Sequence, residues 1–155
     1  DFLNLEVQDG EFYLSELVNS IKAFYIEKLK LLKINFSVSE YNDVIIKGDI
    51  DRAIEVVQNV IENAVKYGDG KSIEITFGKE EDCLLFSVTN SGSEISNTEI
   101  THIFDSFWRG SNVGSNGGSG LGLYICRQLM YKMGGDIFAR NNDGEMTVSL
   151  VFAMM

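Results

Sequence analysis

The chain has 155 residues, 45% of them hydrophobic and 23% charged, which is ordinary for one soluble globular domain with a real core. Thirteen basic residues against 23 acidic ones give a formal net charge of −10, which argues against nucleic acid or an anionic membrane surface as a main partner. Cys83 and Cys126 lie far apart and only one histidine is present, so we expect no metal-binding cysteine motif and two reduced core cysteines of a cytosolic protein.

The first half of the chain is predicted to form two helices separated by two short strands. Residues 14–32 carry apolar side chains at steps of three and four, which predicts a core-facing helix. Residues 33–40 and 43–48 are rich in β-branched and aromatic residues and are predicted as strands joined by a turn-prone Tyr-Asn-Asp. A second amphipathic helix is expected over 50–67, with Asp49 as its N-cap.

Two hairpins are predicted in the second half. Residues 72–78 and 84–90 alternate apolar and polar side chains on either side of a short charged stretch. Residues 136–142 and 145–153 form the last pair, with Asp143-Gly144 as the turn. Both pairs are expected to be antiparallel.

Between these hairpins lie a long loop and a third helix. Residues 90–119 are rich in Gly, Ser and Asn, and loops of this length in a compact domain are usually functional lids or disordered segments. The helix is predicted over about 121–133, followed by two glycines that suit its C-terminus.

The order of these elements predicts an α+β fold. We expect a two-layer sandwich in which a mixed, mostly antiparallel sheet of about five strands is covered on one face by about three helices. Residues 1–10 do not fit this sandwich and resemble the end of a preceding helix. Because the chain also begins on Asp1, we expect it to be a fragment of a longer protein.

A cluster of glycines precedes the third helix: four fall within residues 117–122. The first N–H groups of a helix attract anions, commonly phosphates, and glycines allow close approach. The spacing matches neither a Walker loop nor a dinucleotide-binding fingerprint. Taken alone, this stretch fits a phosphate-binding loop and a flexible loop before an ordinary core helix equally well.

Polar side chains on the second predicted helix suggest a metal and phosphate site. Asn59, Asn63 and Lys66 lie at i, i+4 and i+7 and therefore share one face. Asparagine costs about half a kcal/mol relative to alanine in a helix interior, so two of them call for a compensating role. Their oxygens suit Mg²⁺, and Lys66 can meet phosphate. The alternative is a solvated polar face, which we expect for Glu55 and Glu62.

Three segments of the sequence resemble motifs of a known family. NVIENAVKY (59–67), IFDSFWRG (103–110) and SGLGLYIC (119–126), in this order and spacing, resemble the catalytic domain of two-component sensor histidine kinases. The wider superfamily includes type II topoisomerases, mismatch-repair ATPases and heat-shock chaperones. The resemblance implies a Bergerat-type ATP-binding fold over residues 11–155. It also implies that residues 1–10 end the dimerisation and phosphoacceptor domain.

The resemblance assigns roles residue by residue. Asn63 is implied to coordinate Mg²⁺ and Asn59 to support the metal and the phosphates of ATP. Lys66 and Arg109 are implied to contact phosphate, the latter from the lid. The further implied nucleotide-binding residues are Tyr67, Asn90, Gly92, Ile95, Phe104, Phe107, Gly118, Ser119, Gly120, Leu121, Gly122 and Leu123.

One motif departs from the family. Where the family has Asp-x-Gly-x-Gly, with an aspartate that accepts a hydrogen bond from the adenine amino group, this chain has NSGSEI (90–95). Asn90 can still accept that bond, but a neutral acceptor contributes less than a charged one, by about 1 kcal/mol. Glu94 replaces the second glycine and adds strain of about 1 kcal/mol if its φ is positive. We therefore expect reduced ATP affinity.

The implied activity is transfer of the γ-phosphoryl group of Mg-ATP to a histidine on the neighbouring domain of a homodimer, with a response regulator as a further partner. His102 lies beside the IFDSFW segment and is interpreted as a surface residue, not the acceptor. Two alternatives stay open: an ATP hydrolase, although Asn59 stands where those enzymes have a glutamate base, and a degenerate nucleotide sensor. The family places this domain in the cytoplasm of membrane-anchored sensors, without direct membrane contact.

Overall fold

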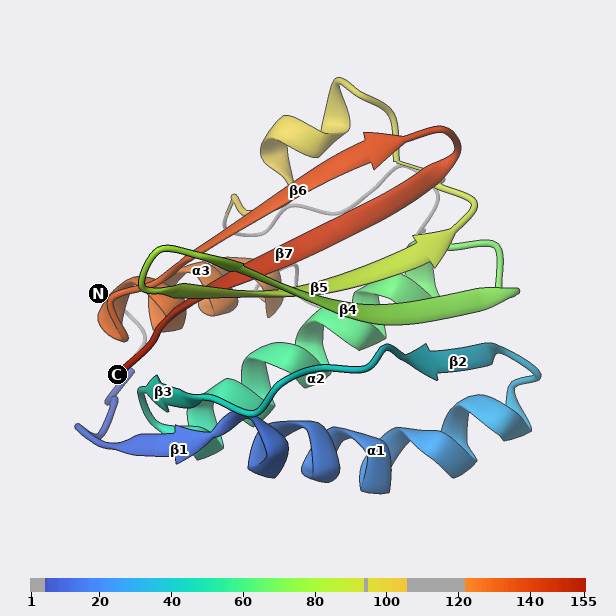
Figure 1. Cartoon of the computed structure of the whole chain (residues 1–155). Helices are drawn as coiled ribbons and strands as arrows, with labels where there is room; N and C mark the ends of the chain where they lie inside the picture. The colour runs from blue at the N-terminus through green and yellow to red at the C-terminus, as the bar shows by residue number, and fades with distance from the viewer. Residues whose placement is uncertain (1–4, 94, 106–121) are drawn as a thin grey trace.

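A computed structural model describes residues 5–93, 95–105 and 122–155 (Figure 1). Its helices are α1 (Leu14–Leu31), α2 (Ile50–Tyr67), α3 (Gly122–Lys132) and the short 3₁₀ helix η1 (Glu99–His102). Its strands are β1 (Glu11–Tyr13), β2 (Asn35–Val38), β3 (Ile45–Lys47), β4 (Ser72–Glu80), β5 (Cys83–Ser91), β6 (Asp136–Asn142) and β7 (Glu145–Ala153).

Five strands form one sheet in the order β2-β4-β5-β7-β6. The β2–β4 pair is parallel, and the other three pairs are antiparallel. Helices α1, α2 and α3 all lie on one face of this sheet (Figure 1). The predicted α+β sandwich with a mixed, mostly antiparallel sheet is therefore confirmed, and both predicted hairpins are present. Strands β1 and β3 form an additional two-stranded sheet.

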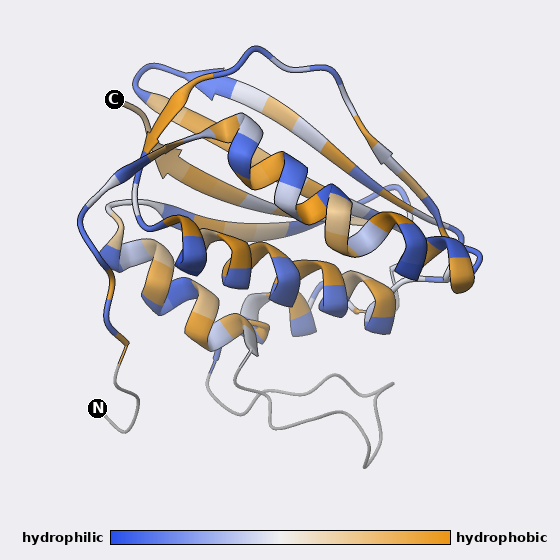
Figure 2. Ribbon diagram, turned by 90° about the horizontal axis from the view of Figure 1, so that it is seen from below, coloured by the Kyte–Doolittle hydropathy of each residue, from blue (hydrophilic) through white to orange (hydrophobic). Residues whose placement is uncertain are grey.

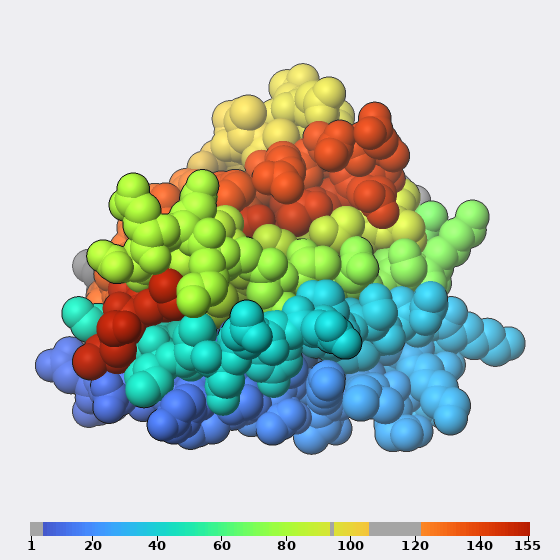
Figure 3. All heavy atoms as spheres, viewed as in Figure 1, coloured from blue at the N-terminus to red at the C-terminus, as the bar shows by residue number. Residues whose placement is uncertain are grey.

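The predicted pairing of the two early strands is wrong. Strand β2 pairs with β4, and β3 pairs with β1, so the segment between them crosses the molecule between α1 and β4 (Figure 3). The Tyr41 ring packs on Phe77 with centroids 4.9 Å apart. Asp43 accepts hydrogen bonds from the backbone N–H of Ser15 (2.9 Å) and from its hydroxyl (2.7 Å). Asp43 thus caps the first turn of α1, and the turn-prone segment does not close a hairpin.

The expected helix at the start of the chain is also wrong for residues 5–10, which are irregular. Leu5 is buried against the core, and the Lys132 ammonium donates a hydrogen bond to its carbonyl oxygen. The Arg52 Nε donates to the carbonyl oxygen of Glu6 at 2.8 Å. These contacts with α2 and α3 replace the helical hydrogen bonds. The assignment of residues 1–10 to a preceding domain stays a prediction.

Helix α2 packs against α1, α3 and strands β4 and β5, and it contributes many side chains to the core. Most of its apolar side chains are buried, and its polar side is drawn in blue in Figure 2. As predicted, Asp49 caps it: Oδ1 accepts hydrogen bonds from the backbone N–H of Asp51 (3.0 Å) and Arg52 (3.3 Å). The buried side chains of α2 are Ala53, Val56, Val57, Val60, Ile61, Ala64 and Tyr67.

A carboxylate on α2 joins this helix to α1. The buried Tyr25 hydroxyl donates to Glu62 Oε2 at 2.7 Å, and the Lys28 ammonium lies 2.8 Å from the same oxygen. Burial acts to raise the pKa of Glu62, but the hydrogen bonds from Lys28 and Tyr25 outweigh it, and the pKa falls below its ordinary value. Glu62 is therefore paired, and it is not simply solvated as the sequence suggested.

We expect Glu62→Gln to lower the free energy of unfolding by about 1 kcal/mol at neutral pH, because the ion pair is lost while a hydrogen bond to Tyr25 is kept. Since folding lowers the pKa of Glu62, its contribution is present above the unfolded value and is lost as the pH falls through the folded value. Urea unfolding should show that the difference in free energy of unfolding between wild type and Glu62→Gln shrinks as the pH falls below 4.5, the ordinary pKa of glutamate. Glu27→Gln on exposed α1 surface is the control. A difference independent of pH would contradict the pairing.

Candidate nucleotide site

The two asparagines of α2 are held by hydrogen bonds to their own helix. Asn59 Nδ2 donates to the carbonyl oxygen of Glu55 at 3.0 Å, and Asn63 Nδ2 donates to the carbonyl oxygen of Asn59 at 2.9 Å. These bonds one turn back occupy the amino end of each amide and offset part of the cost of asparagine in a helix. Each side chain is half-buried, and its remaining polar atom is a carbonyl oxygen.

The start of α3 lies against these amides. A Cβ atom added to Gly122 would lie 3.2 Å from Asn59 Oδ1 and 3.9 Å from Asn63 Nδ2. The helices are held together where the buried Cys126 thiol approaches the Val56 carbonyl oxygen at 3.6 Å. The positive N-terminal end of α3 is therefore next to the amide oxygen of Asn59 and the amide group of Asn63, which is a suitable arrangement for a metal-bound phosphate chain.

Asn90 lies beside the C-terminal end of α2. It is 2% exposed, and a Cβ atom on Gly68, which follows α2, would lie 3.0 Å from its Nδ2. That Nδ2 donates two long hydrogen bonds, of 3.4 Å each, to the carbonyl oxygens of Ser91 and Gly92. Asn59 precedes Gly68 by nine residues, which is about 13 Å along the helix. The amide pair and Asn90 can thus contact opposite ends of one elongated ligand.

Gly92 is needed for two reasons. Its φ is +63°, and a Cβ atom there would come within 2.5 Å of the Asp69 side chain. Asp69 ties the loop to the end of α2, because its N–H donates to the Ser91 carbonyl oxygen (3.0 Å) and Oδ1 accepts from the Ser91 hydroxyl (2.6 Å). Hydrogen bonds from the Ser91 hydroxyl and the Lys71 N–H hold the pKa of Asp69 below its usual value.

The remaining predicted residues divide into three groups. Lys66 is exposed, whereas Tyr67 is 3% exposed. Three apolar residues are almost fully buried and can shape the site only through packing: Ile95, Phe104 and Leu123. Predicted residues outside the described part of the chain are Arg109, Phe107, Gly118, Ser119, Gly120 and Leu121, and the expectation for Glu94 also lies outside it.

His102 and the cysteines behave largely as expected. His102 is exposed, and its Nδ1 lies 2.9 Å from the Asp105 carboxylate. Both cysteines are free; Cys126 is buried, which raises the pKa of its thiol, while Cys83 is only partly buried. Within the described residues, no group of three or more His, Cys, Asp or Glu side chains could hold a metal ion. A metal at this site would therefore depend on amide oxygens, phosphates and water.

Sequence reasoning missed Asn141 in β6. Its side chain exchanges hydrogen bonds with Ser93, Ile95 and Asn97, in the loop that follows Asn90. The only signal in the sequence is an asparagine within a predicted strand, where this residue type is uncommon. Its contact with the loop depends on strand register, which the sequence pattern alone does not give.

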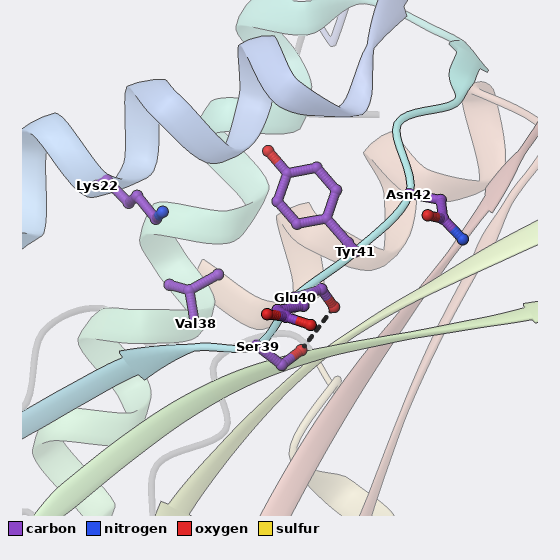
Figure 4. Close-up of a pocket in the computed structure, with 6 residues that line it drawn as sticks. All are labelled: Lys22, Val38, Ser39, Glu40, Tyr41 and Asn42. Carbon is purple, nitrogen blue, oxygen red and sulfur yellow. Dashed lines mark hydrogen bonds between the residues drawn. The ribbon is translucent and has the colours of Figure 1, made fainter.

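A separate hollow of about 580 Å³ lies between α1 and the segment after β2 (Figure 4). None of the predicted site residues that the structure describes lines it. A single lysine, Lys22, faces it, and the Ser39 hydroxyl there donates to the Glu40 carbonyl oxygen at 3.4 Å. It therefore lacks the collection of donors that a phosphate chain requires. Its lining residues are Lys22, Val38, Ser39, Glu40, Tyr41 and Asn42.

The fold is an α+β sandwich, and comparison with known proteins identifies its family. Residues 48–154 match the family described as histidine kinase-, DNA gyrase B-, and HSP90-like ATPases. Sensor protein VanS of Enterococcus faecium is 36% identical over 108 residues, which make up 68% of this chain and 28% of VanS. Sensor histidine kinase RcsC of Escherichia coli (strain K12) is 32% identical over 144 residues, 90% of this chain and 15% of RcsC.

Solved structures agree. The catalytic domain of histidine kinase ThkA is 27% identical, with a TM-score of 0.82 over 95% of this chain and 96% of the ThkA chain. The chain thus belongs to the histidine kinase-, DNA gyrase B- and HSP90-like ATPase family, and its resemblance to sensor histidine kinase catalytic domains is confirmed. It spans 28% or less of the length of VanS and RcsC. Within the described residues, no helix has the length and apolar character to cross a membrane.

We expect Gly122→Ala to weaken ATP binding about fivefold, because the new Cβ would crowd Asn59 Oδ1 at 3.2 Å. Stability should stay the same or rise slightly, since alanine is the better helix former. Calorimetric titration and thermal unfolding measure both quantities. Gly78→Ala is the control, because its Cβ would make only ordinary contacts with Leu85 at 3.8 Å. Unchanged affinity in the Gly122 variant would show that the start of α3 is not part of the site.

Proposed function

We propose that this chain binds Mg-ATP and transfers the γ-phosphoryl group to a histidine on a dimerisation and phosphoacceptor domain of the same protein, in two-component signalling. The observation that carries the proposal is the pair of anchored amides, Asn59 and Asn63, beside the first residue of α3. The family match and the names of the relatives support the same reading.

In this proposal the residues act by holding the nucleotide in place. Asn63 supplies an amide oxygen to Mg²⁺, and Asn59 supports the metal and the phosphates. When bound, the ion neutralises phosphate charge. Lys66 and Arg109 add positive charge at the phosphates, and Asn90 accepts a hydrogen bond from the adenine amino group. Phosphoryl transfer needs mainly alignment and charge neutralisation, so no base on this chain is required.

Particular residues argue for or against two other activities, ATP hydrolysis and nucleotide sensing. An ATP hydrolase needs a group that takes a proton from water, and the Asn59 amide is not basic; its amino group is also engaged with the Glu55 carbonyl oxygen. Phosphoryl transfer is therefore favoured over hydrolysis. A nucleotide sensor without kinase activity is favoured only by the neutral acceptor at Asn90, which lowers affinity and leaves the phosphate end of the site intact.

The proposal also names partners outside the chain. One solved structure shows ThkA, 26% identical to this chain, in complex with the response regulator protein TrrA, and it matches 96% of this chain with a TM-score of 0.79. We propose a response regulator as the partner of the whole protein here too. We further propose that residues 1–10 are the end of the preceding dimerisation and phosphoacceptor domain, and that the catalytic domain works on the cytoplasmic side of a membrane-anchored sensor.

Nucleotide titration followed by phosphotransfer tests the proposal. The chain is mixed with γ-labelled ATP, Mg²⁺ and the phosphoacceptor domain of its full-length protein. We expect acid-labile label on the acceptor domain. Release of inorganic phosphate without labelled acceptor would indicate a hydrolase. Binding with neither product would indicate a sensor, and the absence of binding would contradict all three.

We expect Asn63→Ala to weaken Mg²⁺-dependent ATP binding by tenfold or more, about 1.4 kcal/mol, because one metal ligand is lost. The fold should stay near wild type, since among the described residues the side chain bonds to its own helix. Calorimetry with and without Mg²⁺ gives the affinities, and Asn19→Ala on the exposed side of α1 is the matched control. Undiminished affinity would remove Asn63 from the site.

We expect Asn90→Asp to tighten ATP binding by up to about tenfold, since a carboxylate is the stronger acceptor for the adenine amino group. The bonds to Ser91 and Gly92 are long, at 3.4 Å, and contribute little, but the carboxylate oxygen that replaces Nδ2 is repelled by these two carbonyl oxygens, which offsets part of the gain. GTP presents an oxygen at the corresponding position, and its binding should fall or stay undetectable. An unchanged ratio of ATP to GTP affinity would show that Asn90 does not read the base.

A further inference from the structure

The loop after β5 is fastened to the β6–β7 hairpin mainly by one side chain. The Ser93 hydroxyl donates to Asn141 Oδ1 at 2.6 Å. Asn141 Nδ2 donates in turn to the carbonyl oxygen of Ile95 at 2.9 Å and to Asn97 Oδ1 at 3.2 Å. The Ser93 N–H adds one backbone bond to the Gly144 carbonyl oxygen at 2.9 Å. Asn141 thus bonds to three residues of the loop.

These bonds require an amide. The Asn141 amide accepts a hydrogen bond through its oxygen and donates two through its nitrogen. Among side chains of this length, only asparagine can do both at pH 7. Asparagine is disfavoured in strands. The neighbouring Asn142 is exposed and lies on the opposite side of the strand, so the two positions have the same residue type and different surroundings.

Sheet register places Asn141 beside the proposed adenine site. Met146 of β7 pairs with Asn90 on one side and with Asn141 on the other. Residues in one row across a sheet point to the same face, so Asn90 and Asn141 share the helix-covered face, about 10 Å apart. The fastened loop begins directly after Gly92 and includes the buried Ile95.

We propose that Asn141 is a positioning residue for adenine recognition: it fixes Ser93, Ile95 and Asn97 so that the loop beside Asn90 and Gly92 keeps the shape that accepts the base. It acts through the loop and does not itself contact the nucleotide. This inference rests on the proposed ATP-binding function.

The test compares substitutions at two adjacent asparagines. Asn141→Ala removes all three side-chain bonds, and Asn141→Asp keeps the acceptor for Ser93 but loses both donated bonds. We expect each to weaken ATP about tenfold and to reduce the preference for ATP over GTP. Asn142→Ala and Asn142→Asp control for strand composition and added charge, and both should behave as wild type. Calorimetric titrations of the chain with ATP and with GTP, together with melting temperatures, give the readout.

The outcomes separate this inference from the function on which it rests. Wild-type ATP affinity in the Asn141 variants would overturn the inference and leave the proposed function intact. Equal loss of ATP and GTP binding together with a lower melting temperature would show a merely structural role and overturn it as well. If an Asn141 variant does not fold, Ser93→Ala tests the same contact from the loop side, and unchanged ATP preference there would overturn the inference. Absence of ATP binding by the wild type would defeat the proposed function, and the inference with it.

Discussion

The site depends on how two asparagine side chains bond to the helix that carries them. Each donates its Nδ2 to a carbonyl oxygen one turn back, at 3.0 Å for Asn59 and 2.9 Å for Asn63. Without these bonds, an amide on a half-exposed helix face can rotate and present either end to a ligand. With them, the oxygen is the end that remains available. These bonds therefore have two effects. They offset part of the cost of asparagine within α2, and they leave the amide oxygen available as a metal ligand.

Helix α2 also sets the distance between the two ends of the site. Asn59 lies next to Gly122 at the start of α3, and Gly68 at the other end lies next to Asn90. Because α2 buries side chains from Ala53 to Tyr67 and is capped by Asp49, this separation is fixed by the core and does not depend on a loop. Residues 5–10 bond to the same helix through Arg52, so the chain that leads into the domain is joined to the element that carries the asparagines.

Sequence patterns predicted those helices and turns that depend on residues close together in the chain. The apolar spacing over 50–67 and the Asp143-Gly144 turn were sufficient, because a helix face and a tight turn are properties of neighbouring residues. The pairing of β2 with β4 was not predictable in this way. It depends on where Tyr41 and Asp43 find partners, and these are Phe77 and Ser15, each far away along the chain.

In the site too, features set by neighbouring residues were predicted and those set by distant residues were not. Asn59 and Asn63 were predicted from a helical spacing and a chemical cost, and the structure brings both next to Gly122. The link from Asn141 to the loop after Asn90 was missed because it depends on the register of three strands. Glu62 was taken as a solvated residue because its partners, Tyr25 and Lys28, lie on another helix.

Paramagnetic relaxation by Mn²⁺-ATP tests most directly whether the anchored amides hold the metal. Mn²⁺ accepts the same oxygen ligands as Mg²⁺, and it broadens nuclear resonances most strongly at short range. The account predicts the greatest broadening at the side-chain amides of Asn59 and Asn63 and at the Gly122 N–H, with little effect at Asn19 or at Lys22 in the separate hollow. Strongest broadening around that hollow, or equal broadening at Asn19 and Asn63, would contradict it.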